Sequence, residues 1–342
     1  MLMTRREFLG ATALSVLGSA ALPRAASLLA QAPTDKELSS PSKFDHPEIR
    51  VGMYSMSRAD NFAPLLSEIN AEQWKAINGG DPPQPQRIRV ARLVAVFDKA
   101  RGKAERVAKL YSSVSLVAKA PEDFIGHVDA VMINDDGSMR HQDQAVRYLE
   151  AGLPTWVDKL LSRDPDEAAR LFALADTHRT LLLSCSLLRY APEAAEAKKR
   201  LRSIEPLRTV HAYGPNELIY YGIHPTELCY AVLGRGVVRV QNIGERGREL
   251  VRMDYADGRR MVLEVCERSA YSFQAGFYGE KGWFTIEAKD MGAMARGLVA
   301  GFVESVRTGK AAIPREETLE IIRVLAAAEK SRLSGGVVVE IQ

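Results

Sequence analysis

The amino-acid sequence predicts an α/β protein with an N-terminal Rossmann-type parallel sheet and a C-terminal α/β domain built on a largely antiparallel open sheet. Between residues 49 and 184, short β-branched runs alternate with helical patterns, as they do in the βαβ units of a parallel sheet. From about residue 207, strand-like segments follow one another with little helix between them, which favours antiparallel pairing. A chain of 342 residues is long enough for two domains, which we place at 48–186 and 187–342.

Helix signals between the apolar runs define the parallel half. Gly152 is a helix-stop residue after one helical pattern, and Asp164-Pro165 supplies an N-cap and a first-turn proline for the next. Residues 78–87 are rich in proline, glycine and polar side chains, so they form an exposed loop in the first crossover. We predict strands at 49–54, 88–97, 128–133, 155–157 and 180–185, and helices at 62–77, 101–111, 140–151 and 164–178.

The second half is dominated by strand patterns. Asp257-Gly258 is a hairpin turn signal between two of them. Three helical patterns accompany the sheet, and the Met and aromatic residues of 253–284 are expected to pack it. We predict strands at 207–213, 236–243, 249–255, 260–266, 270–279 and 282–287, and helices at 224–233, 290–308 and 315–333.

The composition is that of a globular protein, with 46% hydrophobic and 26% charged residues. The 46 basic and 43 acidic side chains give a formal net charge of only +3, without a basic block, so we expect no nucleic-acid partner. Cys185, Cys229 and Cys266 lie far apart without a CxxC motif. This spacing excludes a disulfide framework and a zinc site recognisable from cysteine spacing. It does not exclude one disulfide bond between two of the three cysteines.

The first 32 residues have the layout of an export signal. Arg5 and Arg6 precede an apolar run over 11–22, and paired arginines are typical of the Tat route. The run is shorter than the roughly 20 residues that span a bilayer, so we expect no stable membrane span. The alternative is a cytosolic protein with an accidentally basic start. We predict a Tat-type signal peptide over 1–32, a linker over 33–47, recognition by the Tat translocon, and a periplasmic or otherwise extracytoplasmic location.

Ligands bind at the carboxyl ends of parallel strands, so the loop after the first strand is the first candidate site. It carries the sequence SMSRAD, where a dinucleotide-binding protein usually has G-x-G-x-x-G. Serine fits a tight turn but adopts a positive φ at a higher cost than glycine. Asp60 brings negative charge to the place of a pyrophosphate, which Arg58 can partly offset. We therefore take Ser55, Met56 and Ser57 as cofactor contacts in a degenerate fingerprint.

Polar residues also follow the other strands. Asp98 ends the second strand, where a carboxylate can accept hydrogen bonds from an adenosine ribose or cap the next helix, and both interpretations stay open. Asn134 follows the third strand and Asp158 the fourth, and we take both as further cofactor contacts. Lys159 comes next, either as an acid–base or polarising group or as a surface lysine.

The second half offers one candidate for proton transfer. His224 precedes Pro225, which suits the first turn of a helix. A histidine there can carry a proton near neutral pH or serve as a hydrogen-bonded structural residue. Asp135 and Asp136 with His141 do not make a convincing ligand set, and helix capping explains them, so we predict no metal site.

Taken together, these segments resemble the Gfo/Idh/MocA family of glucose–fructose oxidoreductases and inositol dehydrogenases. The sequence AGLPTWVDKL, ending at Leu160, resembles the family's A-G-K-x-V-x-x-E-K-P and places Lys159 on its catalytic lysine. LRYAP at 188–192 matches R-[FY]-x-P, and GIH, ending at His224, matches G-[IV]-H with its active-site histidine. VDAV before Met132 and the segment from Pro314 onward are also similar, so the resemblance covers nearly all of the chain after the signal.

The resemblance implies an NAD(P)-dependent oxidoreductase that acts on a hydroxyl of a sugar or cyclitol. His224 would exchange the hydroxyl proton and Lys159 would polarise its oxygen, while Arg189, Tyr220 and Tyr221 would contact the substrate. The family also implies a homodimer or homotetramer formed through the outer face of the antiparallel sheet.

Three departures from the family pattern leave other functions open. The glycine fingerprint is lost, Asp158 and Leu160 replace the Glu and Pro around the lysine, and Tyr220 replaces an Asp that many members carry four residues before the histidine. The alternatives are an NAD-dependent glycoside-cleaving enzyme and a cofactor-free periplasmic binding or interaction protein. The carboxylate of Asp98 would repel a 2′-phosphate and so favours NAD over NADP, a preference weakened by Lys99 and Arg101.

Overall fold

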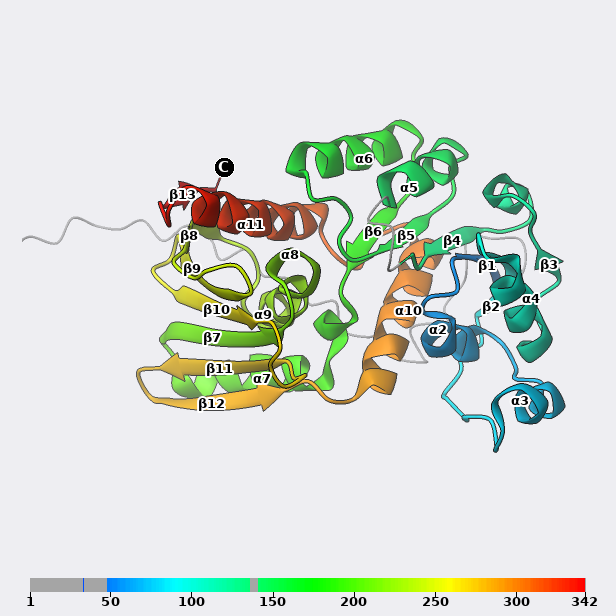
Figure 1. Cartoon of the computed structure of the whole chain (residues 1–342), viewed down its shortest axis with the longest axis horizontal. Coiled ribbons are helices and arrows are strands. Elements are labelled where there is room, and N and C mark those ends of the chain that lie inside the picture. The colour runs from blue at the N-terminus through cyan, green and yellow to red at the C-terminus, as the bar shows by residue number, and fades with distance from the viewer. Residues whose placement is uncertain (1–32, 34–47, 136–140, 342) are drawn as a thin grey trace, which may run out of the picture.

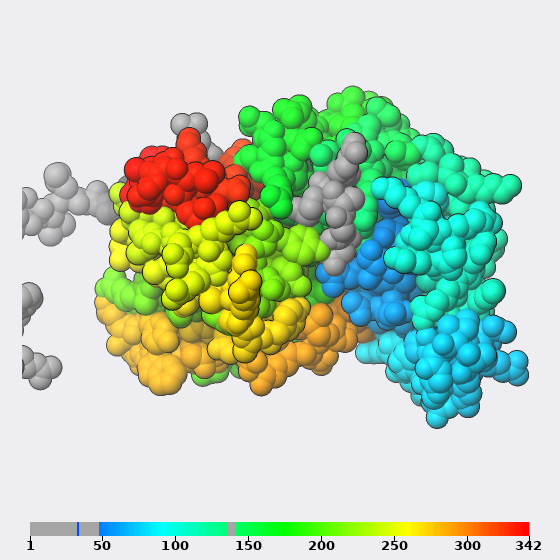
Figure 2. Space-filling model, in the orientation of Figure 1, coloured from blue at the N-terminus to red at the C-terminus, as the bar shows by residue number. Residues whose placement is uncertain are grey.

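The computed structural model describes residue 33, residues 48–135 and residues 141–341. The predicted signal peptide and almost all of the predicted linker therefore lie outside the described residues. Two sheets with their helices lie side by side (Figure 1). In the space-filling view, the yellow and orange segments of the second sheet form one side of the molecule and the blue and cyan segments of the first half form the other (Figure 2).

The first sheet is parallel throughout its described strands. Its order is β3-β2-β1-β4-β5-β6, so the chain starts in the middle and crosses to the other side after β3. Most residues of the central strands are buried. In a parallel sheet helices cover both faces, so the strands do not alternate between apolar and polar residues. The strands are β1 (Ile49–Tyr54), β2 (Ala91–Phe97), β3 (Leu116–Val117), β4 (Ala130–Ile133), β5 (Thr155–Asp158) and β6 (Leu182–Cys185).

The helices of this half confirm the prediction with one correction. The single helix expected over 62–77 is two helices, because the chain is extended at Ser67 and the Asn70 side chain accepts the amide of Gln73, which starts a second helix. The two-residue strand β3 was also not predicted. The helices are α2 (Ala59–Leu66), α3 (Ala71–Asn78), α4 (Arg101–Leu110), η1 (Pro121–Phe124), α5 (His141–Glu150) and α6 (Pro165–Thr177).

The second sheet has the order β12-β11-β7-β10-β9-β8-β13. Among its described strands, only the β7–β10 pair is parallel, which confirms the largely antiparallel prediction. The expected hairpin at Asp257-Gly258 joins β9 and β10, with Gly258 at a φ of 87°. The strands are β7 (Leu207–Pro215), β8 (Val237–Asn242), β9 (Arg248–Tyr255), β10 (Arg260–Cys266), β11 (Gln274–Gly279), β12 (Gly282–Glu287) and β13 (Val339–Glu340).

Helices of the second half both cover its sheet and reach the first half. Helices α7 and α9 pack against β7, β11 or β12, whereas α10 packs against α2 and α11 packs against both α6 and β8 (Figure 1). The boundary at 186/187 stays a prediction. No helix among the described residues has both the length and the apolar character to cross a membrane. The helices are η2 (Leu187–Tyr190), α7 (Pro192–Ile204), α8 (Leu218–Tyr221), α9 (Ile223–Leu233), α10 (Met291–Thr308) and α11 (Arg315–Leu333).

Candidate active site

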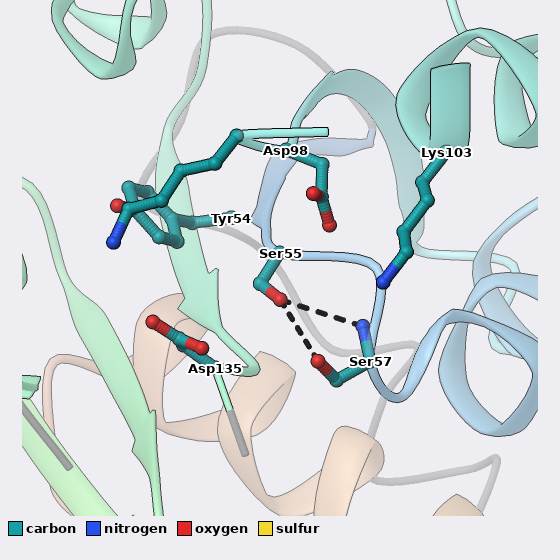
Figure 3. A pocket seen from close by; sticks show the side chains of 7 residues that line it. Tyr54, Ser55, Ser57, Asp98, Lys103 and Asp135 are labelled. Carbon is teal, nitrogen blue, oxygen red and sulfur yellow. Dashed lines mark hydrogen bonds between the residues drawn. The ribbon is translucent and has the colours of Figure 1, made fainter. Parts of the chain in front are cut away.

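The carboxyl ends of β1, β2 and β4 surround a polar pocket of about 380 Å³ (Figure 3). Three of the predicted cofactor contacts line it, and two lysines that follow β2 add positive charge. The lining residues are Tyr54, Ser55, Ser57, Asp98, Lys99, Lys103 and Asp135.

Ser55 gives the first βα turn the backbone conformation that a glycine usually provides. Its φ is 63°, in the left-handed region. Its Oγ lies 3.0 Å from the Oγ of Ser57 and accepts the Ser57 amide at 3.4 Å (Figure 3). The tight turn is therefore kept without a glycine, at a conformational cost of about 1–2 kcal/mol.

Asp98 both supports the loop and lines the pocket. One carboxylate oxygen accepts the Met56 amide and the other accepts the Ala100 amide, each at 2.8 Å. Each oxygen keeps a second lone pair, so accepting these two amides does not prevent contact with a ligand. Met56 itself is buried and donates its amide to Asp98, and its predicted contact with the cofactor stays a prediction.

The charged residues of the loop make contacts away from this pocket. Asp60 lies 3.8 Å from Arg106 of α4, counting from Oδ1 to Nη1, so part of its charge is balanced there. Arg58 reaches the end of β5, where its Nε is 3.7 Å from the Oδ2 of Asp158. The loop after β1 is thereby linked to the strand end that carries Lys159.

Asn134 follows β4 and is fully buried. Neither its Oδ1 nor its Nδ2 has a hydrogen-bond partner among the described residues. A buried polar group without a partner costs about 1–3 kcal/mol. This amide, at the carboxyl edge of the sheet, is therefore a group that a bound polar ligand would satisfy.

Lys159 is buried, which shows that the surface-lysine alternative is wrong. Its side chain is 2% exposed, and its Nζ lies 3.9 Å from the Oδ2 of Asp158. The same Nζ lies 4.1 Å from the centre of the Tyr220 ring, so α8 of the second half covers the end of β5. The peptide bond from Lys159 to Leu160 is cis. The Oδ2 of Asp158 is thus within 4 Å of the charged groups of both Lys159 and Arg58.

His224 is held at the start of α9. Its Nδ1 and the Oγ of Ser186 share a hydrogen bond of 2.6 Å. The rings of Tyr221 and Phe273 approach the imidazole edge to face, with centroids at 5.4 and 5.3 Å. The imidazole is 6% exposed and fixed from three sides.

Aromatic rings connect Lys159 to His224. The ring of Tyr220, which contacts Lys159, lies 5.4 Å from that of Tyr221, and Tyr221 contacts His224. Tyr271 completes the cluster and is 67% exposed. Two groups predicted for catalysis therefore belong to one contact cluster, although they come from the two halves of the chain.

The sequence did not reveal all members of this cluster. Tyr271 and Phe273 precede β11. Phe273 is buried in the core, as predicted for the aromatic residues of 253–284, whereas Tyr271 is exposed, and the two contact Tyr221 and His224 as well. The only available signal was a pair of aromatic residues in a segment rich in Ser and Ala, which does not distinguish a loop from a strand.

His141, which the sequence analysis considered only with Asp135 and Asp136 as a metal ligand, also connects parts of the site. Its Nδ1 lies 2.8 Å from the carbonyl oxygen of Leu160 and its Nε2 lies 2.6 Å from that of Asp135. The imidazole therefore ties the end of β4 to the segment after Lys159. No group of three or more potential metal ligands occurs in the part of the chain that the structure describes.

The described side-chain bonds of Arg189 go to two buried carboxylates, and its predicted role in substrate binding stays a prediction. Arg189 is buried, donates to Glu227, and donates to Glu317 at 2.5 Å. Burial alone would lower the pKa of Arg189, but the charges of Glu227 and Glu317 outweigh it and raise the pKa. Burial raises the pKa of Glu227, and the neighbouring Arg189 opposes that shift. Arg189 thus cross-links η2, α9 and α11.

Solved structures similar to this chain share its whole architecture. Myo-inositol 2-dehydrogenase from Lactobacillus plantarum has a TM-score of 0.71 and 16% identity over 86% of this chain and 100% of its own. Scyllo-inositol dehydrogenase from Lactobacillus casei, with NAD(H) and scyllo-inositol bound, has a TM-score of 0.69 and 17% identity over 86% and 99%. The chain has the Gfo/Idh/MocA fold.

The Gfo/Idh/MocA fold is supported by a third structure as well. Myo-inositol dehydrogenase from Corynebacterium glutamicum has a TM-score of 0.69 and 14% identity over 86% of this chain and 99% of its own. No protein-family model and no curated protein matches the sequence. The chain thus shares this fold with structures that are 14–17% identical to it in sequence.

Proposed function

We propose that this protein is an NAD(P)-dependent oxidoreductase that acts on a hydroxyl group of a sugar or cyclitol. The observation that carries the proposal is the cluster of aromatic rings that joins the buried Lys159 and His224 beside the carboxyl edge of a Rossmann-type sheet. Similar structures named inositol dehydrogenases, one with bound NAD(H) and scyllo-inositol, support it.

The residues at the sheet edge fit a nicotinamide dinucleotide. Asp98 would accept hydrogen bonds from the adenosine ribose, and Ser55 and Ser57 would face the pyrophosphate at the first βα turn. Asn134 has a buried amide that such a ligand would satisfy. The Asp98 carboxylate favours NAD, while Lys99 and Lys103, which line the same pocket, would tolerate a 2′-phosphate.

Lys159 and His224 would have different roles at the substrate hydroxyl group. A bound nicotinamide cofactor would supply the hydride chemistry at the substrate carbon. Lys159 would hold and polarise the hydroxyl oxygen with its ammonium group. His224 would accept the hydroxyl proton during oxidation and return it during reduction, through Nε2, because Nδ1 is engaged with Ser186. Tyr220 and Tyr221 would line the substrate.

The first test is whether the protein carries a nicotinamide cofactor. The protein would be purified under native conditions and denatured, and the supernatant assayed for NAD(H) and NADP(H), with a parallel titration of the apo form. We expect stoichiometric cofactor or saturable binding of at least one of the two. Absence of both, up to millimolar NAD(P), would contradict the proposal and favour a binding protein that has lost its cofactor.

We further propose export by the Tat route and assembly into a homodimer or homotetramer. The paired Arg5 and Arg6 before an apolar run support export. Tyr278 and Trp283 support assembly, because they stack at 6.3 Å and are exposed by 39% and 67% on the second sheet.

A further inference from the structure

We propose that His141 is a positioning residue that carries a proton on both ring nitrogens in the folded protein at neutral pH. In this form it joins the end of β4, which borders the pocket, to the segment that follows Lys159. The part of the inference that concerns Lys159 rests on the proposed function. The protonation state of the imidazole can be measured without a cofactor or a substrate.

Both hydrogen-bond partners of the His141 ring are carbonyl oxygens. Nδ1 lies 2.8 Å from the carbonyl oxygen of Leu160, and Nε2 lies 2.6 Å from that of Asp135. A backbone carbonyl can only accept, whereas a neutral imidazole has one N–H donor and one acceptor nitrogen. In either neutral tautomer, one ring nitrogen would therefore direct its lone pair at the lone pairs of a nearby oxygen. The imidazolium form donates to both carbonyls.

The burial of His141 makes this arrangement obligatory. The residue is 1% exposed, so bulk water cannot replace either carbonyl as a partner. A buried charge is costly unless its donors are satisfied and its charge is balanced. Both N–H groups of the imidazolium have an acceptor. Asp135 also carries a carboxylate, which accepts a hydrogen bond from the Gln144 side chain.

The elements around His141 carry more acidic than basic side chains. Helix α5 packs against β4, β5 and α6, and the buried side chains of α6 are apolar. Burial raises the pKa of Tyr54 and Tyr148, so both stay neutral near pH 7. The charged groups at the strand ends and on α5, η1 and α6 are Asp135, Arg58, Asp158, Lys159, Asp143, Arg147, Glu122 and Glu167. Among these described residues carboxylates outnumber cations, which favours a further positive charge.

The imidazolium connects two parts of the candidate active site. Asp135 lines the pocket at the carboxyl edge of the sheet, and Leu160 directly follows Lys159. Loss of the second proton would turn one of the two hydrogen bonds into a repulsive contact. The pocket wall and the Lys159 segment would then be joined through this ring by one bond only.

NMR of the full chain with ¹⁵N-labelled histidine tests the protonation state. The sequence has 6 histidines, so the signals of His141 can be identified from their loss in His141→Gln, or in His141→Asn should the first variant not fold. We expect both ring nitrogens of His141 to have the ¹⁵N shift of a protonated nitrogen at pH 7. The exposed His178 is the internal reference and should lose its second proton near about pH 6.5. If either ring nitrogen of His141 lacks a proton at pH 7, the proposal is wrong.

The same proton links folding to pH. An unfolded chain releases it near about pH 6.5, so the stabilisation by His141 is complete below that pH and is lost as the pH rises toward the release point of the folded protein. His141→Gln cannot titrate. The folding equilibrium constant of the wild type relative to this variant should fall by up to about tenfold per pH unit above pH 6.5, as measured by urea unfolding. A constant ratio would contradict the proposal, and His178→Gln is the control that should show no such trend.

Turnover tests the link to Lys159 once a substrate is found. We expect His141→Leu to lower kcat by about 10- to 100-fold, because the Lys159 segment loses its support, and His141→Gln to recover part of that loss through one restored donor. A decline of the wild-type kcat that coincides with the titration of His141 should be absent in His141→Gln. An unchanged kcat in His141→Leu would overturn the positioning role, and the pH profile of His141→Gln decides if the Leu variant does not fold. If the chain binds no nicotinamide, the proposed function fails, whereas the NMR result still judges His141.

Discussion

At the scale of single residues, the first βα turn shows how a serine can keep the backbone of a glycine motif. Ser55 has a φ of 63° and forms two contacts with Ser57 that offset part of the cost. The loss of the glycine fingerprint therefore changes the side chains of the loop more than its path.

This turn makes a specific prediction for stability. Ser55→Gly should leave the free energy of unfolding within about 1 kcal/mol of the wild type, because relief of the φ cost and loss of the Ser57 contacts nearly cancel. Ser55→Val should lower it by about 1–3 kcal/mol, since a β-branched side chain is poorly tolerated at positive φ. Urea unfolding measures both. Ser57→Val, outside the positive-φ position, is the control and should cost less than Ser55→Val.

Two further variants test the proposed catalytic groups. Lys159→Met and His224→Gln should each reduce turnover by about 10²–10⁴-fold while far-UV circular dichroism stays that of the folded protein. Arg58 would still accompany Asp158 in Lys159→Met, so the fold should survive. The exposed residues Lys199 and His211 supply the controls Lys199→Met and His211→Gln. Full activity in both catalytic variants would contradict the mechanism.

At the scale of elements, side chains that follow strands bind neighbouring loops and helices. Asp98 accepts amides from the loop after β1 and from the start of α4. We expect Asp98→Ala to lower the free energy of unfolding by about 1–2 kcal/mol and also to weaken NAD(H) binding. Asp164→Ala is the matched control, because Asp164 caps α6 through the Asp166 amide away from the pocket. Asp164→Ala should lower the free energy of unfolding by a similar amount, but it should bind NAD(H) with the wild-type affinity in a calorimetric titration.

The buried cluster of Arg189, Glu227 and Glu317 holds η2, α9 and α11 together and predicts a pH effect. Burial raises the pKa of Glu227 above its ordinary value of 4.5. Glu227 therefore contributes its full stabilisation of the folded state below pH 4.5, and this stabilisation is lost as the pH rises through the higher folded-state pKa. Glu227→Gln cannot titrate. Its free energy of unfolding relative to the wild type should therefore increase from pH 4.5 toward neutral pH in urea unfolding.

If the difference in the free energy of unfolding between Glu227→Gln and the wild type does not change across that pH range, the pKa of Glu227 is not raised. The exposed Glu105→Gln serves as the control for general charge effects. Arg189→Met tests the same cluster by removing its cation. It should lower the free energy of unfolding by about 3–5 kcal/mol, because it leaves two buried carboxylates without their positive partner.

The elements could be predicted from the sequence to different extents. Strand Ile49–Tyr54 and helix Arg315–Leu333 have the predicted bounds, because apolar periodicity and turn residues mark both ends. Helix Pro192–Ile204 was missed, since its buried positions are mainly alanines that give a weak apolar stripe. The strand Val339–Glu340 exists through its pairing with β8, which no local pattern reveals.

The candidate site was predictable where local motifs carry it. Lys159 and His224 lie in short patterns with defined spacing. Their partners could not be identified, because Ser186 and Phe273 meet His224 only after the two halves fold together. The buried position of Arg189 was hidden for the same reason, since Glu317 is far away in the sequence.

At the scale of the whole molecule, the second sheet leaves aromatic side chains on its surface. We expect light scattering to give a multiple of the 37.7 kDa chain mass. Trp283→Lys should shift the protein toward the monomer, because it replaces an exposed ring stacked on Tyr278 with a charge. Ile77→Lys is the control, since Ile77 is 39% exposed on α3 in the other half. A monomeric wild type would contradict the predicted assembly.

The packing of α10 and α11 also affects when the protein can fold during synthesis. The strands of the first sheet leave the ribosome long before the helices that cover α2 and α6 are translated. Part of the apolar surface of the first half therefore stays exposed until the end of the chain has left the ribosome. The predicted export by the Tat route would fit this order, because that route carries proteins that have already folded.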